Sequence, residues 1–394
     1  MRIGIVKPDW GFTGGFEVVV RRIEQRLRVE GHDVGWELVP VARLRSDPFR
    51  VAVPEPVRAR SWEAFRYLSM VEAFRAVDTS PYDLVLSTQP PSFAASHPRH
   101  LALFYHHLRI YYDLSEAYVA SGFVDPADHA VAQQAVRTVD AHFVPRVTGW
   151  LAGSESVADR LHRYHGLTEG VNVFHAGSGL AETQLRLAAG DRFEHPICVS
   201  RHEWSKRTEL FVLALKHVPW LQGVAIGSGG RLPFLRDLDA RLSEPGTDLD
   251  ALTDRDLWLN QGTAPRRRIL PGTNVVFAEH LPEDELARRY RNALCVVAPA
   301  YQEDYGLTAI EAMAFGKPVI VCEDGGGLTA FVEDGVNGFV VAPTGRAIAE
   351  AIGRLAADRG LARQMGAAGR ERAAEITWAR AWDELDAAIE QVMA

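Results

Sequence analysis

The chain has 394 residues, of which 47% are hydrophobic and 24% charged, and its formal net charge at pH 7 is −8. The length predicts two domains, and the composition is typical of a globular protein. The negative charge argues against a general nucleic-acid binder, because no basic surplus is left to neutralise phosphates along a strand.

Apolar runs alternate with helical patterns through the N-terminal half. The runs that predict strands are Met1–Val6, Asp83–Ser87, Leu101–His106 and Trp150–Gly153, and the helical patterns include Phe16–Glu30 and Glu155–Tyr164. The chain enters its first strand without a signal peptide, and no stretch of 18 apolar residues occurs. We therefore expect a cytoplasmic protein.

A second series of strands follows a plausible linker that runs from Ala176 through Glu194. Its members are Ile197–Ser200, Val224–Gly227, Val275–Phe277, Cys295–Ala298, Pro318–Val321 and Gly338–Val341. This alternation predicts an α/β protein with two doubly wound parallel sheets. We expect one domain at residues 1–185, a second at 186–375 and a C-terminal helix at 376–394.

Cysteine and aspartate patterns give no sign of a metal site. The three cysteines, Cys198, Cys295 and Cys322, lie in predicted strands without metal or redox spacing, so we expect small core residues. The Asp-x-Asp pairs Asp237–Asp239 and Asp248–Asp250 lie within or beside a polar segment, residues 240–270, and not at a strand end. We expect these pairs on a solvated face, and both residues 240–270 and the arginine-rich residues 41–70 as solvated loops.

Two glutamates, Glu303 and Glu311, lie eight residues apart just after the apolar run Cys295–Ala298. Their spacing predicts a buried strand, a loop that carries Glu303, and a helix that begins near Gly306 and carries Glu311 on its second turn. Both carboxylates should face one crevice at the carboxyl end of a strand, where open parallel sheets bind ligands.

The predicted helix start adds hydrogen-bond donors to that crevice. The backbone N–H groups of Gly306, Leu307 and Thr308 would be unpaired there, and they suit a phosphate or a polyhydroxy group. Carboxylates accept the hydrogen bonds that sugar hydroxyls donate. The combination predicts a nucleotide-sugar site, although an acid near a helix start can also serve the helix dipole alone.

The segment Tyr301–Val319 resembles the signature of glycosyltransferase family 4, in which two glutamates separated by seven residues precede a Met-Ala-x-Gly-x-Pro-Val-Ile run. That run is Met313–Ile320 here, and the glycine-rich turn Gly325–Gly327 follows at the expected place. The chain departs from the family after Glu303, where Asp304 begins an Asp-Tyr-Gly sequence in place of the usual Gly-Phe-Gly. Asp304 adds a negative charge beside the expected donor site, so the identity of the donor is less safely inferred from the resemblance than the fold.

Other segments extend the resemblance. Arg201 and Lys206 match the family's Gly-Arg-x4-Lys element, with Ser200 in place of the glycine. Only four residues of the chain are lysines, so a lysine at a matching position is informative. Gly14 and Gly15 open a Gly-Gly-x-Glu sequence that is similar to the family's first loop, and its spacing does not fit the dinucleotide fingerprint.

Weaker matches concern one histidine and two glycines. The family usually has a histidine near the transferred sugar at the end of the strand that here is Leu101–His106, and register favours His106 over His107. Gly227 and Gly229 match glycines near the donor's ribose and phosphates, and the geometry of a backbone turn explains them equally well.

The resemblance implies the GT-B fold, with two Rossmann-like domains, an interdomain cleft and a C-terminal helix, residues 376–394, that packs back on the first domain. It implies a retaining glycosyltransferase that needs no metal and no cofactor beyond its nucleotide-sugar substrate. The implied donor contacts are Arg201 and Lys206 on the diphosphate, Glu311 on the ribose, Glu303 on sugar hydroxyls, residues 306–308 on phosphate or sugar, and Gly14 and Gly15 on the phosphates.

The alternatives are a sugar-nucleotide epimerase of the same fold and a non-catalytic accessory subunit that binds a nucleotide-sugar. The donor's base and sugar, the oligomeric state and the acceptor, whether a small molecule, a glycan or a lipid-linked sugar, stay open. Residues 41–70 and the tyrosines Tyr105, Tyr111, Tyr112 and Tyr118 could form an acceptor cleft or touch a membrane surface. Ordinary loop and helix-core positions are the favoured interpretation.

Overall fold

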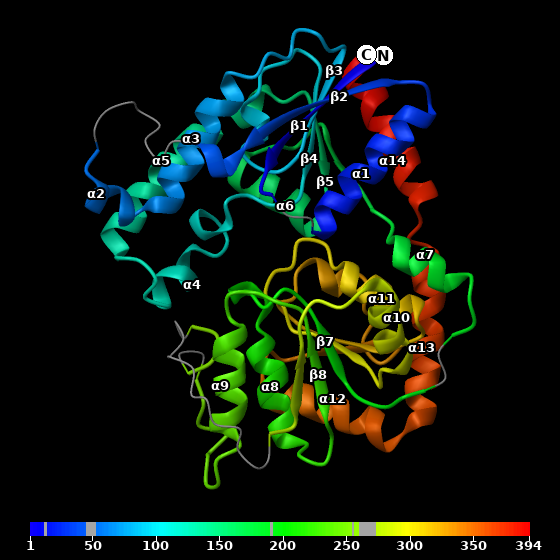
Figure 1. Ribbon diagram of the computed structural model, residues 1–394. Coiled ribbons are helices and arrows are strands. Elements are labelled where there is room, and N and C mark those ends of the chain that lie inside the picture. Colours follow the sequence, from blue (N-terminus) through cyan, green and yellow to red (C-terminus); the bar gives the residue numbers. More distant parts are fainter. Residues whose placement is uncertain (12–13, 45–52, 190–191, 254–255, 260–272) are drawn as a thin grey trace. The chain divides into compact units, whose positions relative to one another are not determined.

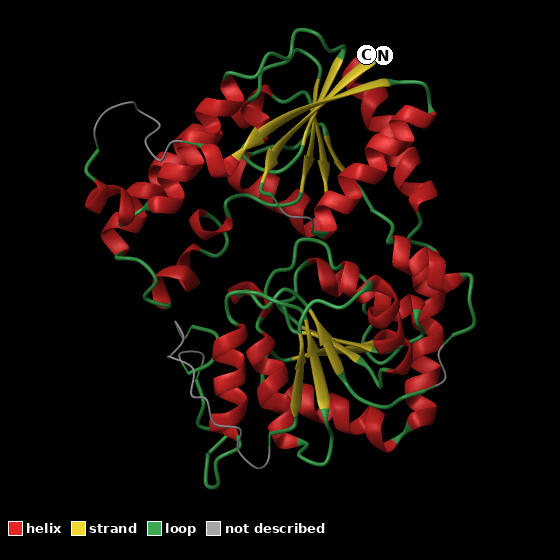
Figure 2. Cartoon of the chain, in the orientation of Figure 1, coloured by secondary structure: helices red, strands yellow, loops and turns green. Residues whose placement is uncertain are grey.

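The computed structural model describes the chain except for residues 12–13, 45–52, 190–191, 254–255 and 260–272 (Figures 1 and 2). Its described residues form two compact units, residues 1–176 with 379–394, and residues 177–378. Each unit contains one six-stranded sheet with helices packed around it (Figure 2). The strand pairs are parallel in both, which confirms the predicted fold class.

The sheet of the first unit has the strand order β2-β1-β3-β4-β5-β6. Its strands are β1 (Arg2–Asp9), β2 (Asp33–Pro40), β3 (Leu84–Ser87), β4 (His100–Phe104), β5 (Gly149–Ala152) and β6 (Val171–Val173). Its helices are α1 (Gly15–Val29), α2 (Glu55–Ala59), α3 (Trp62–Arg75), α4 (Ser115–Ala120), α5 (Pro126–Phe143), α6 (Glu155–His165) and most of α14 (Trp378–Met393).

Four of these strands match the predicted apolar runs, whereas β2 and β6 were not predicted. Both are the outermost strands of the sheet. An edge strand buries less of its surface than a central one and need not carry a continuous apolar run. Strand β2 alternates between buried, half-buried and exposed residues, and β6 has only three residues.

Helix α14 packs on the first unit through its apolar side. Leu385, Ile389 and Val392 are buried. The Glu384 carboxylate accepts from the backbone N–H of His175 at 2.7 Å and lies 2.7 Å from Nδ1 of the same residue. Asn172 donates to Gln391 at 3.0 Å, so polar contacts flank the apolar stripe.

The sheet of the second unit has the order β12-β11-β10-β7-β8-β9. Its strands are β7 (Ile197–Val199), β8 (Gly223–Ile226), β9 (Val275–Ala278), β10 (Val296–Ala298), β11 (Val319–Cys322) and β12 (Gly338–Val341). Its helices are α7 (Gly179–Leu185), α8 (Thr208–His217), α9 (Leu232–Leu242), α10 (Glu283–Asn292), α11 (Leu307–Ala314), α12 (Gly345–Ala357) and α13 (Arg359–Ala374). Helix α7 lies inside the segment expected to be a linker.

The cysteine prediction is confirmed, since Cys198, Cys295 and Cys322 are free and buried. The prediction for the first Asp-x-Asp pair is wrong. Asp237 and Asp239 are buried on α9, where Asp237 accepts from Arg241 at 2.8 Å and Asp239 pairs with Lys216. A helix that packs on a sheet buries every residue on its packed side, including the polar ones. Each buried carboxylate then needs a cationic partner.

The second Asp-x-Asp pair is exposed, as expected. The other polar segments differ from the expected solvated loops where they are described. Residues 55–59 and 62–70 are helical, and Leu257 and Trp258 are buried. Arg45, Arg50 and Arg266–Arg268 lie outside the described residues. No helix in the described ranges is long and apolar enough to span a membrane.

The first unit contains a buried acid that should make stability depend on pH. Asp140 accepts hydrogen bonds from Tyr67 at 2.7 Å and Tyr112 at 2.6 Å. Burial raises the pKa of the Asp140 carboxyl to about 7, although both tyrosine hydrogen bonds lower it in part. The unfolded group titrates near pH ~4, so its stabilising contribution is complete below that pH and is lost as the pH rises to about 7.

We therefore expect the difference in unfolding free energy between wild type and Asp140→Asn to shrink as the pH rises from about 4 to about 7. The slope is at most ~1.4 kcal/mol per pH unit. Urea unfolding at several pH values measures it. Asp159→Asn, a change at an exposed aspartate of the same unit, is the control and should leave the pH profile unchanged. A constant difference between Asp140→Asn and wild type would contradict the prediction.

Candidate functional site

The two predicted glutamates lie where the sequence places them, at the carboxyl end of β10 and on α11. The loop after β10 carries Glu303, whose backbone is tied to the glycine-rich turn: its N–H donates to Gly325 at 3.0 Å, and its carbonyl accepts from Gly327 at 2.7 Å. Gly326 has φ +60°, and a Cβ there would lie 2.7 Å from the Glu303 carbonyl oxygen. The glycines therefore let two chain segments approach closely and fix the Glu303 backbone.

Lys206 is the partner of the Glu303 side chain. It lies in the 3₁₀ turn Trp204–Lys206 after β7, and its Nζ forms an ion pair with Glu303 Oε2. Both side chains are 20% exposed. Strands β7 and β10 are neighbours in the sheet, so their carboxyl ends bring the two residues together although 97 positions separate them. The structure thus places a fixed cation beside a carboxylate that can accept from hydroxyl groups.

Arg201 is exposed and makes no hydrogen bond or ion pair through its side chain to any other described residue. Its backbone position is nevertheless firmly held. The neighbouring Ser200 N–H donates to Ile226, the last residue of β8, at 3.0 Å, and the His202 N–H donates to Ser228 in the loop that follows at 2.8 Å. The guanidinium is therefore a positioned cation that is open to an anionic ligand.

Gly227 and Gly229 make that arrangement sterically possible. They have φ +132° and +155°. A Cβ at Gly227 would lie 2.0 Å from the Ser200 carbonyl oxygen, and a Cβ at Gly229 would lie 2.4 Å from that of His202. These contacts account for both glycines through close approach of two loops, without any ligand.

Glu311, on α11, accepts hydrogen bonds from two other helices: Ser178 is the N-cap of α7 and Tyr290 lies on α10. Its Oε1 accepts from Ser178 and its Oε2 from Tyr290, both at 3.0 Å. Burial raises the pKa of the Glu311 carboxyl, although hydrogen bonds from Tyr290 and Ser178 lower it in part. Two neutral donors orient this carboxylate, whereas a cation holds Glu303, so the two acids have different electrostatic surroundings.

The start of α11 presents the donors that the sequence predicts. Gly306, at φ +116°, is the N-cap, and Leu307 is the first helical residue. The backbone N–H groups of Gly306, Leu307 and Thr308 donate to no other group within the described part of the chain. Unsatisfied N–H groups at a helix start, together with its dipole, favour an anion or a hydroxyl oxygen.

Known proteins with similar sequences are glycosyltransferases. The model of the family described as glycosyl transferases group 1 matches residues 268–372. The chain is 26% identical to D-inositol 3-phosphate glycosyltransferase from Streptomyces bingchenggensis, across 95% of this chain and 84% of that protein. It is 42% identical to the enzyme of the same name from Nocardia farcinica, but over only 27% of this chain and 23% of that protein.

These matches support a glycosyltransferase that is similar to family 4. Two solved structures share its architecture: sucrose-phosphate synthase from Thermosynechococcus elongatus has a TM-score of 0.64 at 20% identity and covers 99% of this chain and 98% of that one. WaaG, a glycosyltransferase involved in lipopolysaccharide biosynthesis, has a TM-score of 0.58 at 13% identity, with 95% of each chain covered. The glycosyltransferase therefore has the GT-B fold that the sequence predicts.

The sequence did not single out Arg207, which organises the glycosyltransferase's second unit beneath Lys206. Its side chain is buried, its φ is +47°, and its guanidinium donates to the Pro299 carbonyl at 2.9 Å and to the carboxylate of Asp324. One side chain thus joins the carboxyl ends of β7, β10 and β11. An acid close to the end of an apolar strand, as Asp324 lies two residues after β11, is the signal that could have suggested this contact.

Trp258 was also missed, because it lies in the polar segment expected to be a loop. Its ring stacks on Trp204 with 5.0 Å between centroids, and its Nε1 donates to the Trp204 carbonyl at 2.9 Å. The ring also lies 5.0 Å from that of Tyr301, between centroids. Trp258 therefore steadies the turn that carries Lys206.

In the first unit, Gly14 and Gly15 form the start of α1, with Gly14 as the N-cap. His106 follows β4 and is half-buried, and its Nδ1 lies 2.7 Å from the His107 carbonyl oxygen. His107 is buried and lies 2.7 Å from His165 between their Nε2 atoms. His107 thus belongs to the core of the unit, and His106 is the histidine with an exposed surface.

No group of three His, Cys, Asp or Glu side chains suited to hold a metal ion occurs among the described residues.

Proposed function

We propose that this glycosyltransferase transfers a sugar from a nucleotide-sugar to a hydroxyl group of its acceptor with retention at the anomeric carbon. The observation that carries the proposal is the Lys206–Glu303 ion pair, formed where two neighbouring strands of the second sheet end. It combines a cation for the leaving diphosphate with a carboxylate for sugar hydroxyls, close in sequence to the free N–H groups at the start of α11.

The donor would occupy the second unit. Arg201, which has no partner among the described residues, and Lys206 would hold the diphosphate and stabilise the charge that develops on it as the sugar leaves. Glu303 would accept from the sugar hydroxyls. Glu311, oriented by Tyr290 and Ser178, would accept from the ribose.

Retention then requires no protein nucleophile. Glu303 is paired with Lys206, which lowers its power to attack a carbon atom. The acceptor hydroxyl would approach from the face on which the diphosphate departs, and a phosphate oxygen would take its proton. Catalysis would come from positioning and from charge stabilisation by fixed cations, so that no metal ion is needed.

The first unit would hold the acceptor. Gly14 and Gly15 stay predicted contacts of the donor phosphates, and His106 stays a predicted neighbour of the transferred sugar. The exposed surface of His106 supports its choice over the buried His107. An epimerase would release no nucleoside diphosphate in an acceptor-dependent way, so assaying that release with and without candidate acceptors separates the two activities.

A thermal-shift screen against UDP, GDP and ADP tests the donor site. One solved structure of this fold, HepE from Anabaena, contains UDP, which makes UDP the first choice. A ligand that binds only the folded protein at 100 times its Kd adds ~2.7 kcal/mol of stability, so we expect a clear rise of Tm with at least one nucleotide.

Arg201→Ala should reduce that rise of Tm. The matched control is Arg236→Ala, which removes another exposed arginine of the same unit, paired with Glu279 on the surface, and should keep the rise. A flat response of the wild type to every nucleoside diphosphate would refute the proposed donor site.

A further inference from the structure

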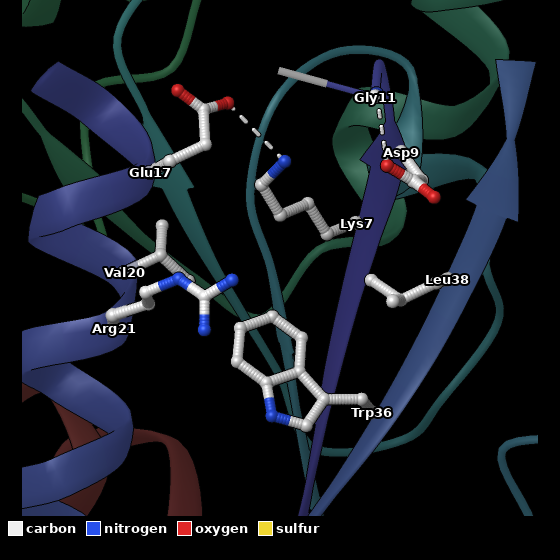
Figure 3. Close-up of a pocket in the computed structure, with 8 residues that line it drawn as sticks. All are labelled: Lys7, Asp9, Gly11, Glu17, Val20, Arg21, Trp36 and Leu38. Carbon is white, nitrogen blue, oxygen red and sulfur yellow. Dashed lines mark hydrogen bonds and ion pairs between the residues drawn. The ribbon is translucent and has the colours of Figure 1, made fainter. Parts of the chain in front are cut away.

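A pocket of about 480 Å³ lies in the first unit, between helix α1 and the strands β1 and β2 (Figure 3). Six side chains carry its chemistry: Lys7 and Asp9 from β1, Glu17 and Arg21 from α1, and Trp36 and Leu38 from β2. The pocket is formed within residues 7–38 and belongs to one unit, so its geometry can be judged without reference to the other.

At one end of the pocket, the charged side chains of Lys7 and Glu17 are paired with each other and with neighbouring polar groups. Lys7 Nζ lies 3.2 Å from Glu17 Oε1 and donates to the Pro8 carbonyl at 2.9 Å. Glu17 Oε2 accepts from the Gly14 N–H at 2.9 Å, and its Oε1 lies 3.4 Å from Gln89 Nε2. Both charged side chains are nearly buried. Lys7 and Glu17 therefore compensate each other and build a rigid wall, and neither is available as an isolated charge for a ligand.

The charge of Arg21 is different. Its side chain is exposed, extends into the pocket and makes no hydrogen bond or ion pair to other described residues (Figure 3). Across the pocket, Asp9 accepts from the Gly11 N–H at 3.0 Å, and its carboxylate keeps further acceptor capacity. The pocket thus offers one free guanidinium and one carboxylate that can accept from hydroxyl groups.

An aromatic surface completes the pocket. Trp36 is half-buried, and its Nε1 donates to Glu24 at 2.8 Å, which fixes the orientation of the indole. Figure 3 shows the Arg21 guanidinium and the Trp36 ring converging from the helix and from the strand. Leu38, 51% exposed, continues the apolar surface along β2. Trp36 and Leu38 thus give the pocket an apolar side on which a ring can pack.

We propose that this pocket binds a sugar ring that carries an anionic substituent, a phosphate or a carboxylate. The apolar face of the ring would pack on Trp36, hydroxyl groups would donate to Asp9, and the anion would accept paired hydrogen bonds from Arg21. A neutral ring would leave the arginine without a partner, and a small anion would leave Trp36 uncovered. The proposal rests on the proposed function only in naming this ring as part of the acceptor.

Calorimetric titration of the intact protein, without donor, tests the pocket with glucose 6-phosphate, glucuronate, glucose and inorganic phosphate. We expect a charged ring to bind at least about tenfold more tightly than either glucose or inorganic phosphate. Glucose 6-phosphate and glucuronate distinguish a phosphate from a carboxylate as the recognised anion. Arg21→Gln should remove the difference in affinity between a charged ring and glucose. Trp36→Leu should weaken the binding of every ring without changing the response to inorganic phosphate.

The matched control is Arg22→Gln, because Arg22 is the next residue of the same helix, is exposed, and does not line the pocket. It makes the same change of net charge and should keep the binding of the wild type. The inference is overturned if neither charged ring binds better than glucose, or if Arg21→Gln and Arg22→Gln behave alike. A Tm rise with UDP measured on the same samples separates failure of the pocket from failure of the donor site.

Discussion

Replacing Lys206 by alanine should lower kcat for sugar transfer by ~10²–10³-fold, because a fixed cation that stabilises a developing charge contributes on this scale. The loss should be larger in kcat than in binding of the donor, since the charge on the leaving diphosphate grows as the bond to the sugar breaks. Steady-state kinetics of nucleoside diphosphate release with a competent donor and acceptor measure it. The side chain is only part-buried, so the variant should fold.

Two controls make this result specific. Lys206→Arg keeps the charge and should keep more activity than the alanine variant, although the geometry of a guanidinium differs from that of an ammonium. Arg236→Ala removes a surface cation of the same unit and should leave kcat near that of the wild type. Near-normal transfer by Lys206→Ala would remove Lys206 from the proposed mechanism.

Replacing Arg207 by methionine should lower the free energy of unfolding by ~3 kcal/mol. Methionine keeps much of the apolar volume but leaves the Pro299 carbonyl without its donor and the Asp324 carboxylate without its cation. Asp324 is 29% exposed, so water offsets part of its loss. Urea unfolding followed by fluorescence and circular dichroism measures the change.

A double-mutant cycle shows whether the ion pair is the cause. Asp324→Asn alone should destabilise less than Arg207→Met, and the two changes together should cost less than the sum of the single changes, because neither charge is then left unpaired. Strict additivity would mean that the pair contributes little and that the contacts of Arg207 with backbone carbonyls hold the loops in place.

The central strands could be predicted from the sequence because they are buried on both faces. The runs at β3, β5, β8 and β11 are largely apolar, and every residue in them is buried. Strand β2, at one edge of the first sheet, could not be predicted in this way. With Trp36 and Leu38 partly exposed, its sequence lacks the burial that makes a strand recognisable.

Contacts between residues that are distant in the sequence could not be predicted either. The motif places Glu303 in a loop and Lys206 in another, but the ion pair between them depends on β7 and β10 being neighbours, which local patterns do not encode. Arg207 and Asp324 are 117 positions apart and meet for the same reason. Trp258 shows a third limit, since one aromatic residue within a polar segment gives no periodic signal.

The Lys206–Glu303 ion pair also bears on how a donor would enter. On the proposed function, the Lys206 ammonium is already neutralised before the substrate binds, because the Glu303 carboxylate serves as its counterion. Arrival of a diphosphate would therefore exchange one anionic partner for another, and only the difference between the two pairings would be gained. The same exchange would release Glu303 from Lys206 when the sugar hydroxyls arrive. Binding of the diphosphate and binding of the sugar would therefore be coupled.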